Sequence, residues 1–565
     1  MQVENVRTAL HTDRTRVVID LSAPPQGQVS SGEGSKRFEL LIPDGAMSTR
    51  IRQRLFVGTL VSAASHERVE EGLRLTFILS QPLQAKTFYL KPYLSRGDRI
   101  VIDFYNPPPV TGTAADLDEA PPADQAAANP GPASRPARAA PRHTERNTFD
   151  LTGTWEHEWA LQAGGASTGK FESNVQPRVE MNLASGVRLT ALGRIRGDTA
   201  GDLGPAANSA NNHSGANGPL VNSEHAELTL RELYLDGRSG DILWRLGKQQ
   251  VVWGQADGIK VMDVVNPQSF REFILDDFDD SRIALWTANV EVLLGDAGSV
   301  QLLWIPDTTY HELAEAGTTF EFSSPLYVPR RPAGLAVRQL GPERPDDLVG
   351  DSDAGLRYSA FWRGWDVTLN YLYHYQDLPV PYQSLANGAG GPLGLVTPQY
   401  ERNHLAGATL SNVFGALTLR SELVYSSDTY HVSSDFSARG IGSSAELSTV
   451  VGLDWQWDAQ DTLLSAQWFQ SHLPDHDRDI VRTGTEHTLS LLYQRDFLYD
   501  TWKFRSLGLY SLDRGDRWIN LKLSHMFRDN LELWLGGDFF GGTRSGLYGQ
   551  FSSRDRILLG MELGF

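Results

Sequence analysis

The chain ends in Arg556-Ile-Leu-Leu-Gly-Met-Glu-Leu-Gly-Phe565, a stretch in which apolar side chains alternate with polar or small ones. Side chains of a β-strand point to opposite faces with a period of two, so this stretch predicts an amphipathic strand. One face carries Ile557, Leu559, Met561, Leu563 and Phe565. The other face carries Arg556, Gly560, Glu562 and Gly564.

The same alternation recurs from Phe149 onward, which predicts a long series of antiparallel strands. Tight turns separate pairs of strand-like runs at 184–186, 237–240, 295–298, 363–365, 413–415, 458–461, 496–500 and 528–530. Between these hairpins lie mostly longer segments rich in Gly, Asn, Pro and Asp, at 197–224, 253–281, 307–354, 376–402, 426–445, 471–485 and 541–553.

Short turns that alternate with long connections, and a final strand that stops on an aromatic residue, are typical of bacterial outer-membrane barrels. The spacing gives about eighteen strands, with about sixteen as the alternative, because one strand pair is open to a different assignment. We therefore expect an all-β fold dominated by a large transmembrane antiparallel β-barrel at residues 149–565. An even number of strands places both ends of the barrel on one side, which we expect to be the periplasm.

Composition excludes several functions. The chain has 565 residues, no cysteine and a net charge of −18, which excludes thiol chemistry and disfavours nucleic acid. No run reaches the roughly 18 apolar residues of a transmembrane helix, and residues 1–20 contain no secretory signal. We therefore expect the sequence to be a mature or trimmed form of an outer-membrane protein.

Residues 1–106 contain short strands whose two halves repeat a pattern. Arg14-Thr-Arg-Val-Val-Ile-Asp-Leu-Ser-Ala-Pro24 matches Leu73-Arg-Leu-Thr-Phe-Ile-Leu-Ser-Gln-Pro82, and Lys36-Arg-Phe-Glu-Leu-Leu-Ile-Pro43 matches Asp98-Arg-Ile-Val-Ile-Asp-Phe-Tyr105. This duplication resembles the AMIN domain, a β module of cell-wall amidases and secretins. The resemblance implies a small, sandwich-like periplasmic domain that binds peptidoglycan. Residues 107–148, rich in Pro and Ala, predict a disordered linker.

The most distinctive run of the barrel region is Leu246-Gly-Lys-Gln-Gln-Val-Val-Trp-Gly-Gln-Ala-Asp-Gly258 with the stretch that follows it to Arg282. It resembles a family of proteobacterial outer-membrane proteins known only by a domain-of-unknown-function label. The resemblance implies partners such as an inner-membrane exporter and a periplasmic carrier. Because residues 253–282 contain many apolar side chains, we expect this segment to fold into the lumen, which a wide barrel otherwise leaves open.

The polar residues of this run are candidates to shape a constriction, although they could equally anchor the segment to the wall: Lys248, Gln250, Trp253, Asp257, Asp263, Asn266 and Arg271. The strand phase also points charges of both signs into the lumen: Arg188, Arg194, Arg231, Arg245, Arg420 and Glu422. A mixture of signs favours cross-strand pairing over an ion-selective ring of one sign.

The sequence therefore predicts an outer-membrane channel or conduit, plugged or gated, for a small, hydrophobic or lipidic molecule. The peptidoglycan-binding domain is expected to position it at the cell wall. A structural tether between outer membrane and peptidoglycan, or an exopolysaccharide export barrel, are the alternatives. We expect no catalytic, metal or cofactor site, because the motifs for phosphate binding, nucleophilic hydrolysis and zinc proteolysis do not occur.

Overall fold

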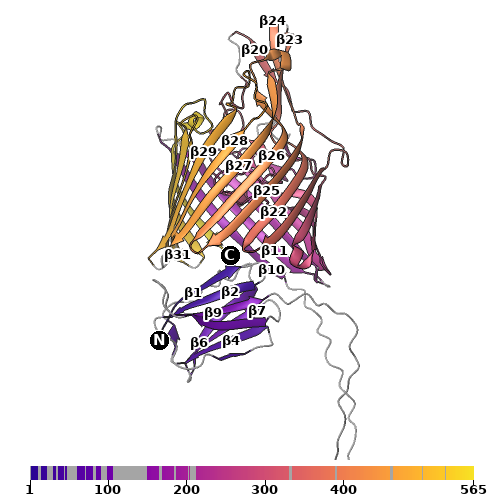
Figure 1. The fold of residues 1–565 in the computed structure, drawn as a ribbon. Coiled ribbons are helices and arrows are strands. Elements are labelled where there is room, and N and C mark those ends of the chain that lie inside the picture. The colour runs from indigo at the N-terminus through magenta and orange to yellow at the C-terminus, as the bar shows by residue number, and fades with distance from the viewer. Residues whose placement is uncertain are drawn as a thin grey trace, which may run out of the picture. The chain divides into compact units, whose positions relative to one another are not determined.

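The computed structural model divides the chain into two compact units, Met1–His143 and Thr144–Phe565 (Figure 1). The predicted linker at 107–148 lies outside the described residues. The structure describes residues 2–10, 14–21, 30–32, 36–43, 45–47, 60–69, 72–79, 84–90, 98–105, 149–163, 168–183, 186–201, 203, 212–329, 334–388, 391–457, 462–498, 501–528 and 530–565.

The first unit consists of two antiparallel sheets that share one apolar core. One sheet has the order β5-β1-β2-β9-β8 and the other the order β3-β4-β7-β6, with β5 joining its sheet in parallel. The strands are β1 Gln2–Leu10, β2 Arg14–Leu21, β3 Ser30–Gly32, β4 Arg37–Pro43, β5 Ala46–Met47, β6 Val61–Val69, β7 Gly72–Leu79, β8 Gln84–Leu90 and β9 Asp98–Tyr105.

Alternate residues of both sheets point into this core. Ile100, Ile102 and Phe104 of β9 are fully buried, as are Leu75 and Phe77 of β7. The Phe104 ring lies 5.2 Å from the ring of Phe38, edge to face, so the two sheets pack directly on each other. The predicted small β-sandwich is therefore present, whereas nothing in this unit tests the peptidoglycan binding implied by the AMIN resemblance.

The duplicated sequence halves are intertwined in this sandwich. The strand matched to β2 by sequence is β7, and the strand matched to β4 is β9, yet β2 pairs with β9 and β4 pairs with β7. The order β1-β2-β9-β8 therefore corresponds, strand for strand, to the order β6-β7-β4-β3 of the other sheet. Each half contributes two strands to each of these four-strand arrangements, so neither half has a complete sheet of its own.

The second unit is a closed antiparallel barrel in which the described residues form eighteen wall strands, β13 (Val221–Asn222) being a two-residue addition beside β14. This confirms the predicted fold class and strand number. The wall strands are β10 Phe149–Gln162, β11 Thr168–Asn182, β12 Arg188–Asp198, β14 Ala226–Ser239, β15 Ile242–Gln249, β17 Leu285–Leu293, β18 Ser299–Ile305, β21 Asp353–Trp362, β22 Trp365–Tyr375, β25 Arg402–Phe414, β26 Leu417–Val432, β27 Ile441–Trp457, β28 Thr462–His472, β29 Thr485–Phe497, β30 Trp502–Ser511, β31 Arg517–Arg528, β32 Leu531–Gly541 and β33 Arg556–Gly564.

The C-terminal stretch closes the barrel. β33 pairs with β10 along its whole length, and the backbone of Phe565 exchanges two hydrogen bonds of 2.9 Å with Gly153. A Cβ atom at position 153 would lie 2.5 Å from the Phe565 ring, so only glycine fits beneath the terminal aromatic side chain. The residue that ends the chain thus also completes the last strand pairing.

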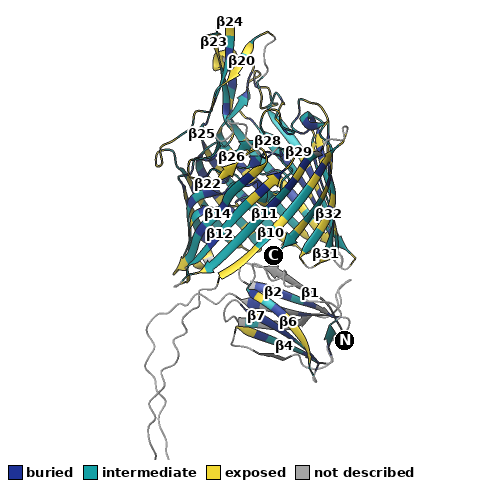
Figure 2. Cartoon of the chain, turned by 180° about the vertical axis from the view of Figure 1, so that it is seen from behind, coloured by how far each residue is buried: buried dark blue, intermediate teal, exposed yellow. Residues whose placement is uncertain are grey.

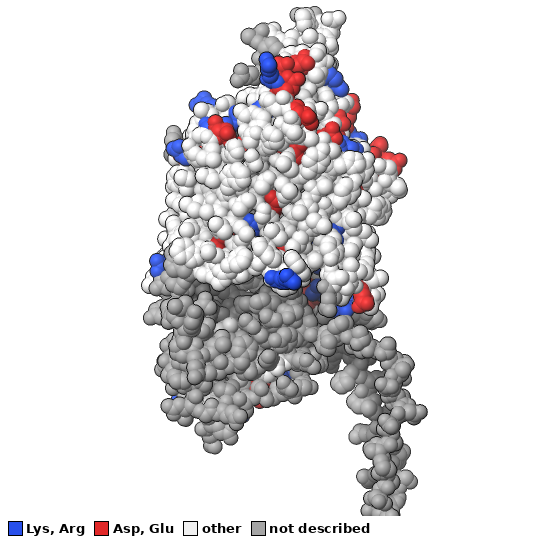
Figure 3. All heavy atoms as spheres, viewed as in Figure 1, with Lys and Arg blue, Asp and Glu red and all other residues white. Residues whose placement is uncertain are grey.

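The outer face of the barrel is apolar. Leu369 of β22 is 55% exposed, whereas its neighbours Thr368 and Asn370 are buried. Exposed and buried residues alternate along the wall strands in Figure 2. On the face seen in Figure 3, charged side chains are sparse on the wall and gather on the long connections at its upper end. Exposed aromatic residues mark the first and last strands of the barrel and the strand ends beside the short turns: Phe149, Phe361, Trp362, Phe414, Trp455, Phe527 and Phe565.

Two long connections differ from the sequence prediction. Residues 426–445 were expected to be irregular, but β26 and β27 remain paired as far as Val432 and Ile441, because Ser and Thr side chains continue the alternation. Residues 376–402 contain the hairpin of β23 (Val380–Gly388) and β24 (Gly391–Gln399), to which β20 (Ala336–Gln339) adds in parallel.

The remaining described elements are short: β16 Ser269–Phe270, β19 Glu312–Leu313, α1 Phe278–Ser281 and the 3₁₀ turns Gly295–Ala297, Phe436–Ala438 and Gly549–Phe551. None of the helices in the described part of the chain is long and apolar enough to cross a membrane.

Candidate functional site

Residues 250–284, which join β15 to β17, fold against the inner wall of the barrel; we call them the lumen segment. Val251, Trp253 and Met262 are buried in a cluster with wall residues of β18, β22, β25 and β26. Farther along, Phe273 packs against residues of β29 to β32. The segment therefore contacts both sides of the barrel interior.

Trp253 anchors the start of the lumen segment. Its side chain is 1% exposed, and its Nε1 donates a hydrogen bond of 2.9 Å to Oε1 of Gln301 on β18. A Cβ atom at Gly355 would lie 3.0 Å from the Trp253 ring, so a glycine on β21 makes room for the indole. The tryptophan predicted to shape a constriction is thus a packing residue.

The carboxylate of Glu422 on β26 holds the next turn of the segment. It accepts backbone N–H hydrogen bonds from Gln255, from Ala256 at 2.9 Å and from Met262 at 2.9 Å. Arg420, two residues earlier on the same face, pairs with Asp257 of the segment and, at 2.8 Å, with Asp454 of β27. A carboxylate on the wall therefore stabilises backbone that no strand pairing satisfies.

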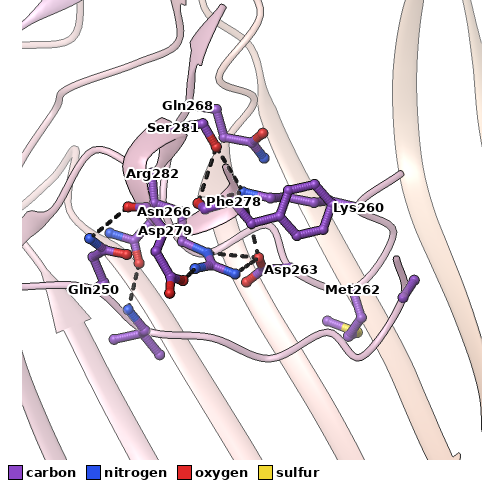
Figure 4. Close-up of polar contacts among 12 residues, drawn as sticks. Gln250, Lys260, Met262, Asp263, Asn266, Gln268, Phe278, Asp279, Ser281 and Arg282 are labelled. Carbon is purple, nitrogen blue, oxygen red and sulfur yellow. Dashed lines mark hydrogen bonds and ion pairs between the residues drawn. The ribbon is translucent and has the colours of Figure 1, made fainter. Parts of the chain in front are cut away.

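Lys260, Asp263 and Arg282 form a buried ionic group within the segment, and Figure 4 shows their side chains pointing toward one another. Arg282 lies 2.8 Å from Oδ2 of Asp263, whereas Lys260 lies 3.8 Å from the same oxygen. Burial lowers the pKa of Lys260 to about 8. Asn266 closes the loop, because its Oδ1 accepts from Val251 N at 2.6 Å and its Nδ2 donates to the Ile283 carbonyl at 2.9 Å.

A second, larger ionic network ties the segment to the opposite wall. Glu272 lies 2.9 Å from Lys170 of β11 and 2.9 Å from Arg556 of β33. Arg271 lies 2.9 Å from Glu172, also on β11. Although burial would raise its pKa, the surrounding cations hold the pKa of Glu272 well below its usual range. The charges are desolvated, so removal of one member leaves the others uncompensated.

Phe273 lies between these ionic residues and an aromatic cluster. Its φ of 58° is in the left-handed region, which a bulky residue seldom adopts, and its side chain is 2% exposed. The Phe273 ring lies 4.7 Å from Phe551 and 5.9 Å from Phe322, centroid to centroid. The unfavourable backbone conformation of Phe273 therefore occurs at a position where its ring packs into this aromatic cluster.

The lumen segment lines a charged cavity and an apolar cavity in the barrel interior. The charged chamber, of about 320 Å³, is lined by the Glu272 network and by strand residues such as Glu156 and Lys522. The apolar chamber, of about 680 Å³, is lined by the segment and by residues of the long connections, including Phe322 and Leu326. Gly258, Ile274, Asp276 and Phe278 line both, so the segment forms the boundary between them.

The two remaining predicted residues, Lys248 and Gln250, lie where β15 meets the lumen segment. Lys248 is in register with Leu233 and Trp286, and its Nζ lies 3.5 Å from the Asn217 carbonyl, so it belongs to the wall and its covering loop and does not join the segment. Gln250 donates to the Asp279 carbonyl at 3.2 Å. The expectation that Lys248 shapes a constriction therefore needs correction, because the outward phase of β15 continues through this residue.

Most of the predicted lumen charges are paired. Arg188 lies 3.3 Å from Asp236, and Arg194 lies 3.0 Å from Glu227. Arg231 pairs with Asp280 of the lumen segment. Arg245 stacks over the ring of Tyr234 at 4.4 Å. This arrangement agrees with the cross-strand pairing that the mixed signs favour.

Sequence reasoning missed the partners on the far wall. Lys170 and Glu172 are about 100 residues from their partners Glu272 and Arg271, and Arg556 is 284 residues from Glu272, so no local pattern joins them. The signal that could have found them is the inward strand phase, which places each on the polar face of its strand. Phase does not say which inward charge contacts a segment that crosses the lumen.

Comparison with known proteins identifies the barrel region. The model of the family described as "Protein of unknown function (DUF1302)" matches residues 194–565. No curated protein matches the chain. Among solved structures, OmpF of Salmonella typhi, in complex with daunomycin, is 10% identical, with 74% of this chain and 98% of that chain covered and a TM-score of 0.36.

Two further solved barrels are similar at the same level. A mutant porin of Rh. blastica is 10% identical, with 74% of this chain and 100% of that chain covered and a TM-score of 0.34. OccAB4 of Acinetobacter baumannii is 11% identical, with 74% and 99% covered and a TM-score of 0.41.

Proposed function

The chain belongs to the DUF1302 family, and we propose that it is an outer-membrane channel whose lumen is narrowed by residues 250–284. Its cargo is a small, hydrophobic or lipidic molecule, and its activity is passage rather than catalysis. The N-terminal sandwich binds peptidoglycan and positions the barrel at the cell wall. The exporter and carrier implied by the sequence resemblance are its partners on the periplasmic side.

The outer face of the barrel supports a membrane location. Leu535 of β32 and Leu559 of β33 are adjacent outward residues, and each is about half exposed in water. Closure leaves no unpaired strand edge, and only a closed barrel or a helix satisfies its backbone in lipid. The aromatic residues beside the short turns correspond to the interfacial girdle of such barrels.

The observation that carries the channel proposal is the lumen segment itself. Barrels of 16 to 18 strands leave an aqueous channel unless something fills it. Here a connection between neighbouring strands contacts β26, β11 and β33, far around the wall. A barrel that served only as an anchor needs about eight strands and no such segment.

Conductance tests the proposal. In planar lipid bilayers, wild-type protein should give small or rare current steps. Replacement of residues 253–282 by a short Gly/Ser linker should raise the single-channel conductance several-fold, because the interior would then resemble that of an open wide barrel. No increase in conductance with this variant would contradict the proposal.

A single substitution makes the same test without a deletion. Phe273→Ala removes an aromatic ring from the cluster that holds the segment, a loss of about 3–5 kcal/mol of local packing. Open events should become more frequent. Phe436→Ala is the matched control, because Phe436 is 53% exposed on a connection at the same end of the barrel. Equal behaviour of the two variants would show that the Phe273 cluster does not gate conduction.

Retention on purified peptidoglycan tests the role of the first unit. The full chain should sediment with sacculi in detergent, whereas a variant that begins at Thr144 should remain in the supernatant. If both sediment equally, the sandwich is not the wall-binding part.

A further inference from the structure

The apolar chamber has the size of a small-molecule site. Its volume of about 680 Å³ falls within the roughly 300–1,000 Å³ of typical ligand pockets. Its lining includes apolar side chains of the lumen segment, such as Val264 and Phe270, together with Phe322 and Leu326 of the connection between β18 and β21. These residues offer contacts to a hydrophobic body.

Polar atoms in this apolar lining lack protein partners. Oδ1 of Asp263 and Nε2 of His374 are buried, and neither has a hydrogen-bond partner among the described residues. Both residues line the apolar chamber. A buried polar atom without a partner costs about 1–3 kcal/mol, so a bound group that supplied the missing hydrogen bonds would be stabilised there.

Lys260 provides a donor beside Asp263. Its Nζ lies 3.5 Å from the Phe278 carbonyl and 3.4 Å from Oγ of Ser281, which are long for hydrogen bonds (Figure 4). A hydroxyl group can donate to Oδ1 of Asp263 and accept from Nζ of Lys260 at the same time.

The charges that face the chamber are compensated. Asp263 is paired with Arg282 at 2.8 Å, and Glu446 lies 3.5 Å from Arg482. Burial raises the pKa of Asp377 well above its usual range, which favours the neutral form of this carboxyl group. Burial also lowers the pKa of His311 to about 3, so this imidazole is neutral as well. Asp276, which lines both chambers, interacts with the cations Lys170 and Arg271. An ionic head group would therefore compete with existing partners for its counter-charge, and its desolvation would be unfavourable.

We propose that the apolar chamber binds an uncharged amphipathic molecule, with a hydrophobic body against Val264, Phe270 and Phe322 and a hydroxyl head at Asp263 and Lys260. This inference rests on the proposed channel function, because it names the chemical class of the cargo. It also assigns the chamber, rather than the charged network, as the place where the cargo is selected.

Photolabelling tests the proposal with three matched probes. The full chain in lipid nanodiscs is exposed to a twelve-carbon straight-chain alcohol that carries a diazirine near its end, or to the corresponding carboxylate or amine. Labelled peptides are located by mass spectrometry. The alcohol should label residues 259–275 and 322–328, and the carboxylate and amine should label them at least about tenfold less, because each head group is charged. Labelling of outward residues should be similar for all three.

Two variants locate the ligand. Val264→Trp fills the chamber and should abolish its labelling, whereas Leu369→Trp adds the same side chain on the lipid-facing side and should leave it unchanged. His374→Phe removes an unpartnered nitrogen. Because the hydroxyl head lies at Asp263, alcohol labelling should change by less than about fivefold, which is the effect expected from the loss of one hydrogen bond. A shift in gel mobility on boiling verifies that each variant is folded.

Three results would overturn the inference: equal labelling by the three head groups, labelling confined to outward residues, or chamber labelling that persists in Val264→Trp. Preference for the carboxylate or amine would assign an ionic ligand instead. These outcomes are independent of the conductance test. If the linker variant conducts but the alcohol does not label the chamber, only the ligand proposal is refuted. If the alcohol labels the chamber but the linker variant does not conduct, only the channel proposal is refuted.

Discussion

The two units of this chain use one sequence pattern in opposite senses. In β9, Ile100, Ile102 and Phe104 alternate with polar residues and are fully buried. In β33, Ile557 and Leu559 alternate in the same way, yet they are 42% and 46% exposed. The difference is the second layer: β9 faces another sheet across a core, whereas the outer face of β33 has no protein layer over it.

This comparison shows what a period of two determines. It establishes that a strand has an apolar face, but the surroundings decide whether that face meets protein or lipid. The interior of the barrel differs from both of these faces. It is polar along the strands, but it becomes a mixed core where the lumen segment packs, with Trp253 in an apolar cluster and Glu272 in an ionic one.

The largest effect is expected for a charge in the core of the first unit. Ile102→Asp should remove most of the roughly 5–15 kcal/mol that stabilises a domain, because the side chain is fully buried without a partner. Limited proteolysis of the full chain should digest the first unit, while the barrel keeps its mobility shift on boiling. Survival of the first unit would mean that the two sheets do not share a core.

A buried charge in the barrel interior should have a smaller and more local effect. Glu272→Ala leaves Lys170 and Arg556 without their shared partner, which should destabilise docking of the lumen segment by about 3–5 kcal/mol. The barrel should still form, but bilayer recordings should show more open time. Glu321→Ala, on an exposed connection, is the control. An unchanged open time would show that the ionic network does not hold the segment.

A charge on the outer face should have an effect that depends on lipid. Leu535→Arg should destabilise the barrel by about 2–4 kcal/mol in a bilayer, the typical penalty near the membrane midplane. Folding into liposomes, followed by urea titration, measures this change, and Leu535→Ile is the conservative control. If the penalty is the same in detergent-free buffer as in lipid, the outer face does not contact acyl chains.

Much of the wall could be predicted from sequence, because short turns at Gly and Asp residues divide the alternating runs into countable strands. The terminal Phe565 identified the closing strand, and its antiparallel pairing with the first strand follows from the even strand number, whereas the register with Gly153 needs the structure. The lumen segment was also predictable in outline, since residues such as Phe273 and Ile274 would otherwise be exposed in a loop.

The contacts of the segment could not be predicted, because they depend on geometry across the lumen. The residue Glu422 was recognised as an inward charge, but its role as an acceptor for backbone N–H groups of Ala256 and Met262 needs the folded loop. For Lys248, by contrast, the predicted position itself was wrong. Its place in the most distinctive run of the barrel region suggested the lumen, whereas strand register places it with Leu233 and Trp286.

The smallest expected effect concerns pH. Burial and the nearby carboxylate of Glu272 raise the pKa of Asp276 to about 6. The folded protein therefore binds this proton more tightly than the unfolded chain, whose aspartate has a pKa of about 3.9. The docked segment should gain stability as the pH falls from 7 through about 6 and should lose it again as the pH rises.

Asp276 lines both chambers, so its protonation should change the conductance measured in bilayers. Open time should decrease when the pH is lowered from 7 to 5, since the neutral carboxyl no longer repels Glu272. Asp276→Asn should be less open at pH 7 and should lose much of the pH response, whereas Asp277→Asn, at an exposed neighbour, should retain it. A wild-type response that persists in full in Asp276→Asn would place the titrating group elsewhere. The boundary between the chambers would then be set by the packing of Phe273 and the ionic partners of Glu272, and not by the protonation of Asp276.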